Sequence, residues 1–154
     1  MARQRKKTPA RKTIQNRRAR FDYQLGDEFV VGIVLSGRET KALRLGRGQL
    51  QGAYVNIRSG ELWLIGAVIH GTNGIPIDEK ESTQDRKLLA KRREIDKLTA
   101  ARQQGNTIVP LELLTRSRFI KLRIAIGRGK KSWDKRQTIK ERSTNRELRR
   151  QIKL

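Results

Sequence analysis

The sequence contains no cysteine and only one histidine, His70. The absence of cysteine excludes disulfides, thiolate nucleophiles and cysteine-ligated zinc together. A lone histidine leaves metal clusters and catalytic triads without their other members. The acidic residues form no candidate acid–base pair, and the group Asp78, Glu79 and Glu81 lies in a loop-like stretch where it should be solvated. We therefore expect no metal, no cofactor and no enzymatic activity.

Long apolar runs and nucleotide-binding loops are missing as well. No segment approaches the roughly 20 apolar residues that span a bilayer, and the first residues lack the apolar stretch of a signal peptide. Residues 46–52 resemble a dinucleotide loop, but the third glycine falls one place late and the run follows a predicted helix instead of a strand. These absences predict a cytoplasmic protein with no membrane partner.

Negative charge is scarce. Lys and Arg total 37 against 15 Asp and Glu, which gives a net charge of +22 at pH 7. Residues 1–20 hold nine basic and no acidic side chains. Residues 21–126 hold 17 basic and 12 acidic side chains, and residues 127–154 hold 11 basic and three acidic ones. Such a surplus attracts polyanions, and nucleic acids release condensed counterions when Lys and Arg bind their phosphates. We expect the two basic ends to be nucleic-acid arms, with simple solubility tails as the alternative.

The apolar pattern places the folded domain at residues 21–126, between a basic disordered arm over 1–20 and a basic tail over 127–154. Two β-rich runs around Ser59-Gly60 predict a hairpin. Gly32 lies inside another such run and predicts a bulge or a tight bend. The expected strands are 29–35, 54–58, 61–65, 107–111 and 118–126.

Two helices are predicted. The first covers residues 38–45 ahead of Gly46, and the second runs from Ser82 or Thr83 to Gln104. The longer helix would carry Leu88, Ile95 and Leu98 on one face, and the preceding stretch 71–81 is expected to be a mobile loop. The fold class is therefore mainly β with helices. It is a small oligonucleotide-binding-like β-barrel with one short and one long helix and basic disordered tails.

The few aromatic residues divide by context. Phe29, Trp63 and Phe119 lie in apolar strand patterns and are expected in the core. Trp133 stands among basic residues, where an exposed ring can stack on bases while its neighbours bind phosphate. The alternative interpretation is that the Trp133 side chain packs onto the barrel. The tail around it has no single apolar stripe, so we expect it to be disordered alone and helical on a phosphate-lined surface.

A series of motifs resembles the SsrA-binding protein (small protein B) family from about residue 16 to residue 142. The opening resembles the family in Asn16-Arg17-Arg18-Ala19-Arg20 and Asp22-Tyr23. The series continues, in order, with Gly32-Ile33-Val34-Leu35-Ser36-Gly37, Glu39, Lys41, Leu43-Arg44, Gly48, Tyr54, Gly60-Glu61, Arg86-Lys87-Leu88-Leu89, Arg93-Glu94-Ile95, Val109-Pro110-Leu111, Gly129-Lys130-Lys131, Asp134-Lys135-Arg136 and Ile139-Lys140-Glu141-Arg142. Each piece is weak alone, but the ordered series is specific.

The resemblance implies a monomeric barrel that grips the elbow of the tRNA-like domain of transfer-messenger RNA. It also implies a tail that becomes helical in a stalled ribosome, from the decoding centre into the empty messenger channel, during trans-translation. Carried over by position, the candidates for the RNA-facing surface are Tyr23, Glu39, Lys41, Arg44, Leu89 and Lys91. The candidates for the ribosomal decoding surface are Gly129, Lys130, Lys131, Trp133, Asp134, Lys135 and Arg136.

The chain departs from the family's pattern near the implied RNA-facing side. Phe21 stands where the family often has His, Val30 where it usually has an acidic residue, and Lys91 where the residue is often uncharged. Residues 71–84 also differ from the usual loop. Three rival interpretations remain open: a ribosomal or assembly protein with a small barrel, an initiation-factor-like barrel, and an RNA-modifying enzyme.

Overall fold

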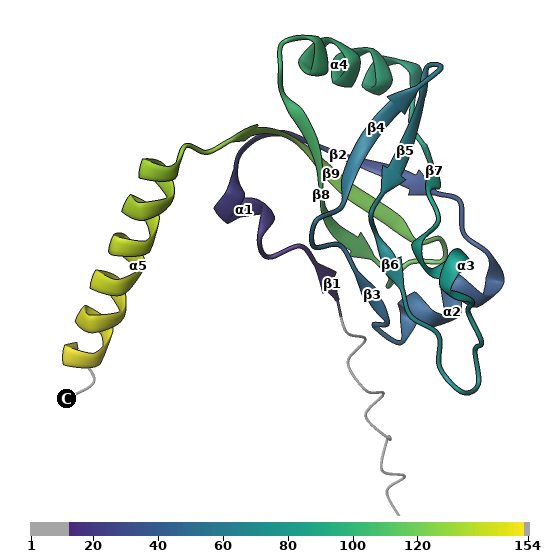
Figure 1. The fold of residues 1–154 in the computed structure, drawn as a ribbon, viewed down its shortest axis with the longest axis horizontal. Helices are drawn as coiled ribbons and strands as arrows, with labels where there is room; N and C mark the ends of the chain where they lie inside the picture. Colours follow the sequence, from purple (N-terminus) through teal and green to yellow (C-terminus); the bar gives the residue numbers. More distant parts are fainter. Residues whose placement is uncertain (1–12, 153–154) are drawn as a thin grey trace, which may run out of the picture.

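A closed β-barrel forms the centre of the computed structural model, which describes residues 13–152 (Figure 1). Its antiparallel sheet has the order β1-β8-β4-β5-β7-β2-β9, and β9 also pairs with β8, so six strands form a closed ring. The strands are β1 (Ile14–Gln15), β2 (Tyr23–Ile33), β3 (Gly48–Gln49), β4 (Tyr54–Arg58), β5 (Glu61–Ile65), β6 (Val68–Ile69), β7 (Arg86–Leu89), β8 (Thr107–Leu114) and β9 (Lys121–Gly129). The helices are α1 (Ala19–Asp22), α2 (Gly37–Arg44), α3 (Glu79–Thr83), α4 (Arg92–Gln103) and α5 (Ser132–Ile152).

The predicted hairpin is confirmed in β4 and β5, which pair from Tyr54↔Ile65 to Arg58↔Glu61. Its two turn residues, Ser59 and Gly60, have φ values of 50° and 74°. Positive φ at both central positions defines the turn type whose twist matches that of paired strands. Serine tolerates this region less easily than glycine, so closure of the strands holds it there.

The bend in the long strand β2 lies earlier than predicted. The pairing of β2 with β9 shifts between Leu25 and Glu28, so the irregularity falls at Gly26 and Asp27 and not at Gly32. Gly32 has a different role. A Cβ there would lie 3.2 Å from the Cβ of Leu89, because β7 runs close beside it. The glycine therefore permits close strand approach instead of a bulge.

The short helix was predicted correctly and the long helix in part. Ser36 begins α2 with a reciprocal capping box to Glu39. The long helix predicted from residue 82 instead divides into α3, β7 and α4. Leu88 lies in β7, 3% exposed, and pairs with Leu62 of β5. The barrel closes only when this strand pairs with its two neighbours. That tertiary pairing outweighs the local helical preference indicated by the spacing of Leu88, Ile95 and Leu98.

The stretch predicted as a mobile loop, residues 71–81, is partly ordered. Thr72 and Ile75 form an isolated bridge, and α3 begins at Glu79. The side chain of Ser82 in α3 donates a hydrogen bond to the carbonyl oxygen of Ile69 at 2.7 Å. This contact attaches α3 to the end of β6.

The aromatic residues expected in the core differ in their burial. Phe29 packs against the main core, as expected, and Trp63 is half-buried. Phe119 is 68% exposed, so its expected core position is wrong. It precedes β9 in the β8–β9 turn, where Ile120 occupies the inward position instead. Trp133 is 61% exposed, which agrees with an accessible ring.

The predicted arm over residues 1–20 falls partly outside the described residues, which begin at 13. Within the described part the prediction of disorder is wrong. Ile14 is 6% exposed in the core and pairs with Leu113 of β8, and Ala19 is 2% exposed. The sequence signal was weak because basic residues surround these two apolar side chains. The segment from residue 13 onward therefore packs onto the barrel.

The tail is present as the helix α5, which leaves the end of β9 and runs beside the barrel (Figure 1). None of its residues is buried. No helix in residues 13–152 is both long and apolar enough to cross a membrane. Whether α5 is helical without a phosphate-lined partner stays a prediction.

We expect Ile14→Ala to lower the free energy of unfolding by about 2 kcal/mol or more, because it removes buried apolar volume between β1 and the core. Urea denaturation measures the change. Gln15→Ala is the matched control, since Gln15 is the exposed neighbour in the same strand. Equal, small effects of both substitutions would contradict packing of β1 onto the barrel.

Candidate RNA-binding surfaces

The six barrel candidates do not form one cluster. Leu89 and Lys91 flank the link from β7 to α4, Glu39, Lys41 and Arg44 lie on α2, and Tyr23 begins β2. In Figure 1, α4 and α2 lie at opposite ends of the barrel, and Tyr23 lies near α1. Tyr23 lies nine residue steps along β2 from Gly32, the partner of Leu89, which is at most roughly 30 Å at about 3.3 Å per step.

Glu39 is buried, so its expected position on the RNA-facing surface is wrong. Its side chain and that of Arg86 are each 1% exposed and form an ion pair. The Glu39 Oε1 atom accepts hydrogen bonds from Arg86 Nε at 3.1 Å, Arg86 Nη2 at 3.0 Å and Gln84 Nε2 at 2.9 Å. Its Oε2 atom accepts from the backbone N–H of Ser36 at 3.0 Å. Glu39 therefore joins α2 to β7 and cannot touch a ligand directly.

Arg86 completes this network. Its guanidinium also donates to the carbonyl oxygens of Ala67, Glu81, Ser82 and Gln84 at 2.8–3.2 Å. These carbonyls belong to α3 and to the segments that flank it. Five donors in a fixed fork suit such a junction, because one side chain satisfies several otherwise unpaired carbonyls. Sequence analysis missed Arg86 because a buried arginine has no distinctive local pattern.

Arg44 also has a structural role. Its guanidinium donates to the carbonyl oxygens of Thr115, Ser117 and Arg118 at 2.8–3.2 Å. These bonds hold the β8–β9 turn against α2. Lys41, on the same helix, is exposed and free to reach an external phosphate. Lys41 and Arg44 of this helix therefore differ in their availability to a ligand.

An apolar surface surrounds Gly32 on the outer side of the sheet. Val30, Val34 and Leu89 are 44%, 51% and 55% exposed. Leu89 pairs directly with Gly32, whose missing side chain lets the Leu89 side chain lie close against the strand. Lys91 follows immediately and begins α4. An apolar surface beside a cation suits apolar contact with an RNA together with pairing to a phosphate. Val30, noted above only as a departure from the family's pattern, joins this surface, and Val34 is an addition that the sequence did not indicate.

Tyr23 is half-buried in a second, smaller core. Its ring packs with Ala19, Val109, Leu111 and Ala125 between α1 and the barrel. It also lines a groove of about 480 Å³ that includes Tyr54 and Arg102. Tyr23 is therefore partly accessible to a ligand in this groove.

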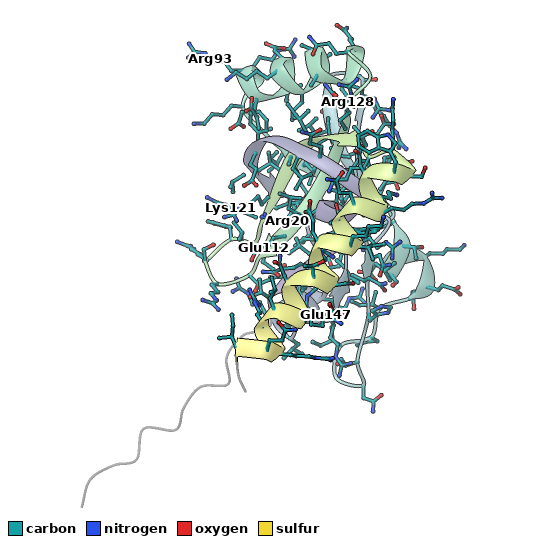
Figure 2. All side chains as sticks on the ribbon, turned by 90° about the vertical axis from the view of Figure 1, so that its left-hand side faces the viewer. Arg20, Arg93, Glu112, Lys121, Arg128 and Glu147 are labelled. Carbon is teal, nitrogen blue, oxygen red and sulfur yellow. The ribbon has the colours of Figure 1, made fainter. Side chains whose placement is uncertain are left out.

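The seven tail candidates begin at the end of β9 and continue into α5. Gly129, Lys131, Trp133 and Arg136 are exposed, and Asp134 is half-buried. In Figure 2, α5 crosses in front of the barrel from Arg128, at the end of β9, down to Glu147 near its last turns. Most of the helix therefore offers its charged side chains to a partner.

Two lysines attach the start of the tail to α1. The backbone N–H of Lys130 donates to the Asp22 carbonyl oxygen at 3.0 Å, and its Nζ donates to the Arg20 carbonyl oxygen at 3.1 Å. Lys135 Nζ lies 3.3 Å from Asp22 Oδ1. These two tail candidates are therefore engaged with the body of the protein in this structure.

No group of three His, Asp or Glu side chains suited to a metal ion occurs among residues 13–152. The available chemistry is instead cationic and apolar. Exposed Lys and Arg side chains supply phosphate contacts, and the surface around Gly32 supplies apolar contact area.

The sequence profile of the SmpB protein family matches residues 13–154. The chain belongs to the SmpB family. Three relatives, each named SsrA-binding protein, agree with this assignment. The protein of Coxiella burnetii (strain CbuK_Q154) is 45% identical over 99% of this chain and 98% of its own length. That of Synechococcus sp. (strain JA-3-3Ab) is 44% identical over 91% and 92%, and that of Pseudomonas putida (strain KT2440) is 43% identical over 99% and 96%.

A chain from a solved structure confirms the fold. It comes from a structure described as "tmRNA-SmpB: a journey to the center of the bacterial ribosome" and is similar with a TM-score of 0.64 and 31% identity. The match covers 78% of this chain and 85% of that one. The expected family resemblance and the expected fold class, a small oligonucleotide-binding-like barrel with helices, are therefore both confirmed.

We expect Glu39→Ala to lower the free energy of unfolding by about 3–5 kcal/mol, because it leaves the buried Arg86 guanidinium without its carboxylate. Chemical denaturation measures this. Glu79→Ala is the matched control, since Glu79 is exposed on the neighbouring α3. A loss no larger than that of the control would show that the ion pair does not hold α2 against β7.

Proposed function

We propose that the protein binds the tRNA-like domain of transfer-messenger RNA and delivers it to the A site of stalled ribosomes. The observation that carries this proposal is the near full-length match to proteins named SsrA-binding protein, together with the likeness to the tmRNA-SmpB structure. A net charge of +22 fits a polyanionic partner. The proposal places the protein in the cytoplasm as a monomer, needs no cofactor and assigns no bond chemistry to it.

The barrel is the part proposed to grip the folded RNA. Recognition of a tRNA-like elbow needs a surface of fixed shape, since duplex RNA is read largely by shape and backbone. The closed ring of strands supplies that rigidity. The accessible candidates are Leu89 and Lys91 beside Gly32, Lys41 on α2, and the half-buried Tyr23. Glu39 and Arg44 have structural roles instead, since Glu39 holds α2 to β7 and Arg44 holds the β8–β9 turn to α2.

The tail is proposed to occupy the decoding centre and the empty messenger channel. A helix that is polar nearly all round gains little from packing on its own barrel. A channel lined by phosphates would instead pair with its Lys and Arg side chains. Trp133, exposed among Lys131, Lys135 and Arg136, adds a ring that can stack on a ribosomal base.

We expect the purified protein to prefer transfer-messenger RNA over an elongator tRNA and a ribosomal RNA fragment by about a hundredfold, equal to about 2.7 kcal/mol. Competition binding at physiological salt measures the ratio. Equal affinity for all three RNAs would instead favour a ribosomal or assembly protein that binds RNA through charge alone.

We expect Asp134→Ala combined with Lys135→Ala to abolish tagging of stalled products while transfer-messenger RNA binding stays within about threefold, or 0.7 kcal/mol. The reason is that these residues lie on α5, away from the Leu89 and Lys91 surface. A reconstituted tagging assay and RNA binding are measured together. Parallel loss of both activities would contradict separate roles for barrel and tail.

A further inference from the structure

We propose that the β8–β9 turn carries a stacking site for one unpaired base of transfer-messenger RNA. The base lies on the ring of Phe119, and Lys41 and Arg118 bind the adjoining phosphates. The inference deepens the proposed function and rests on it for the identity of the RNA. It adds an aromatic ring and a turn that the candidate surfaces described above do not contain.

Phe119 is held in solvent by an ordered turn. Its side chain is 68% exposed, while the next residue, Ile120, is 5% exposed and packs into the core. The Arg44 guanidinium donates to three carbonyl oxygens of the turn, and the Ser117 hydroxyl donates to the Phe119 carbonyl oxygen at 3.1 Å. These hydrogen bonds fix the backbone on both sides of the ring. A ring that is already fixed loses little freedom when a base stacks on it.

The two segments that meet at this turn carry only positive charge. Residues 40–47 and 113–121 together hold six basic and no acidic side chains. The carboxylates that flank these segments, Glu39 and Glu112, are each paired with an arginine. A surface with unopposed positive charge attracts phosphates, whose counterions are released on binding.

Lys41 is placed to bind one of these phosphates. It is exposed, and no carboxylate in the described part of the chain forms an ion pair with it. Lys41 lies one helical turn before Arg44, so it shares the side of α2 that faces the β8–β9 turn. The α2 helix therefore adds a cation beside Phe119.

The contact between Arg118 and Phe119 suits a whole nucleotide. The guanidinium carbon of Arg118 lies 5.4 Å from the centroid of the ring. The ring offers a base its π-face, and the guanidinium offers a phosphate two parallel hydrogen bonds. An isolated phosphate would use the guanidinium and leave the ring exposed to water. The pair therefore matches a base together with its phosphate.

The turn continues the surface formed by Leu89 and Lys91. Leu89 pairs with Gly32 and Gly32 pairs with Lys121, so the side chains of Leu89 and Lys121 face the same side of the sheet, roughly 10 Å apart. Phe119 lies two residues before Lys121, and both are exposed. Figure 2 shows Lys121 near the left edge of the molecule. An RNA that binds at Leu89 can therefore extend to Phe119.

This continuity favours RNA over the other possible occupants of the turn. A second copy of a chain with a net charge of +22 would bring like charges together at a basic surface. An acidic protein segment would match the charge but would not need the ring. The candidate RNA-facing surface adjoins the turn through one row of paired residues.

Leu45 supplies a matched control. It is 57% exposed and directly follows Arg44, which bonds to the turn. Leu45 thus offers apolar area beside the same turn, but it has no π-face. A stacked base needs the ring of Phe119 alone, whereas an apolar protein partner would use Leu45 as well.

The test measures the affinity of the full-length protein for transfer-messenger RNA at physiological salt. We expect Phe119→Leu to weaken binding about tenfold, the scale of one lost base–aromatic stack. Phe119→Tyr keeps a ring and should bind like the original chain, as should Leu45→Ala. Affinity for small ribosomal subunits should be unchanged in all three variants. Circular dichroism confirms that each variant is folded.

The salt dependence of the same binding separates phosphate contacts from stacking. The slope of log affinity against log salt should decrease by about one in Lys41→Gln, because one phosphate contact is lost. The slope should stay unchanged in Phe119→Leu, since stacking releases no counterions. An unchanged slope in Lys41→Gln would contradict the phosphate site on α2.

Three further results would overturn the inference. The first is unchanged affinity for transfer-messenger RNA in Phe119→Leu. The second is an equal loss in Leu45→Ala, which would indicate an apolar contact instead of a stacked base. The third is a loss confined to small ribosomal subunits, which would assign the turn to ribosomal RNA.

Failure of the proposed function would give a different result. The original protein would then show no preference for transfer-messenger RNA over an elongator tRNA. Phe119→Leu and Phe119→Tyr would still be compared on the RNA that the protein does bind. Equal affinities of these two variants would show that the turn stacks no base.

Discussion

The buried ion pair of Glu39 and Arg86 is the interaction on which the arrangement of this protein depends. Burying two charges is costly, and it succeeds here because every strong acceptor and donor of the pair is satisfied. The pair fixes the end of β7 against α2 and α3. Since β7 lies between β5 and β2, it completes the ring of strands. The exposed surface formed by Leu89, Lys91 and Gly32 is therefore positioned by two residues that no ligand touches.

Basic residues serve two different purposes in the same small domain. Arg44 and Arg86 direct their guanidinium groups to backbone carbonyl oxygens. They supply these carbonyls with hydrogen-bond donors that the loop backbone does not provide. Arg17, Arg142 and Lys41 remain without carboxylate partners in the described part of the chain. Net charge alone does not separate these roles. The separation follows from which arginines lie near unpaired carbonyls once the strands have closed.

The junction of α1 and α5 connects the barrel to its tail. Lys130, just before α5, and Lys135, in its first turn, bond to residues of α1, and none of the residues of α5 is buried. One end of the tail thus has a defined direction while its length stays available to a partner. Phe21 lies at this junction, with the guanidinium of Arg142 from α5 5.7 Å from the centroid of its ring.

The sequence by itself determined the strands with strong alternation, the hairpin at Ser59-Gly60, the helix capped by Ser36 and the basic ends, because each of these depends on neighbours along the chain. The ordered motifs also identified the family. Tertiary structure alone decided that Leu88 lies in a strand, that Ile14 joins the core and that Phe119 faces solvent. It also decided that Glu39 is buried and that Phe21 meets Arg142, 121 positions away. These outcomes depend on partners distant in sequence, which closing the barrel brings together and local periodicity does not encode.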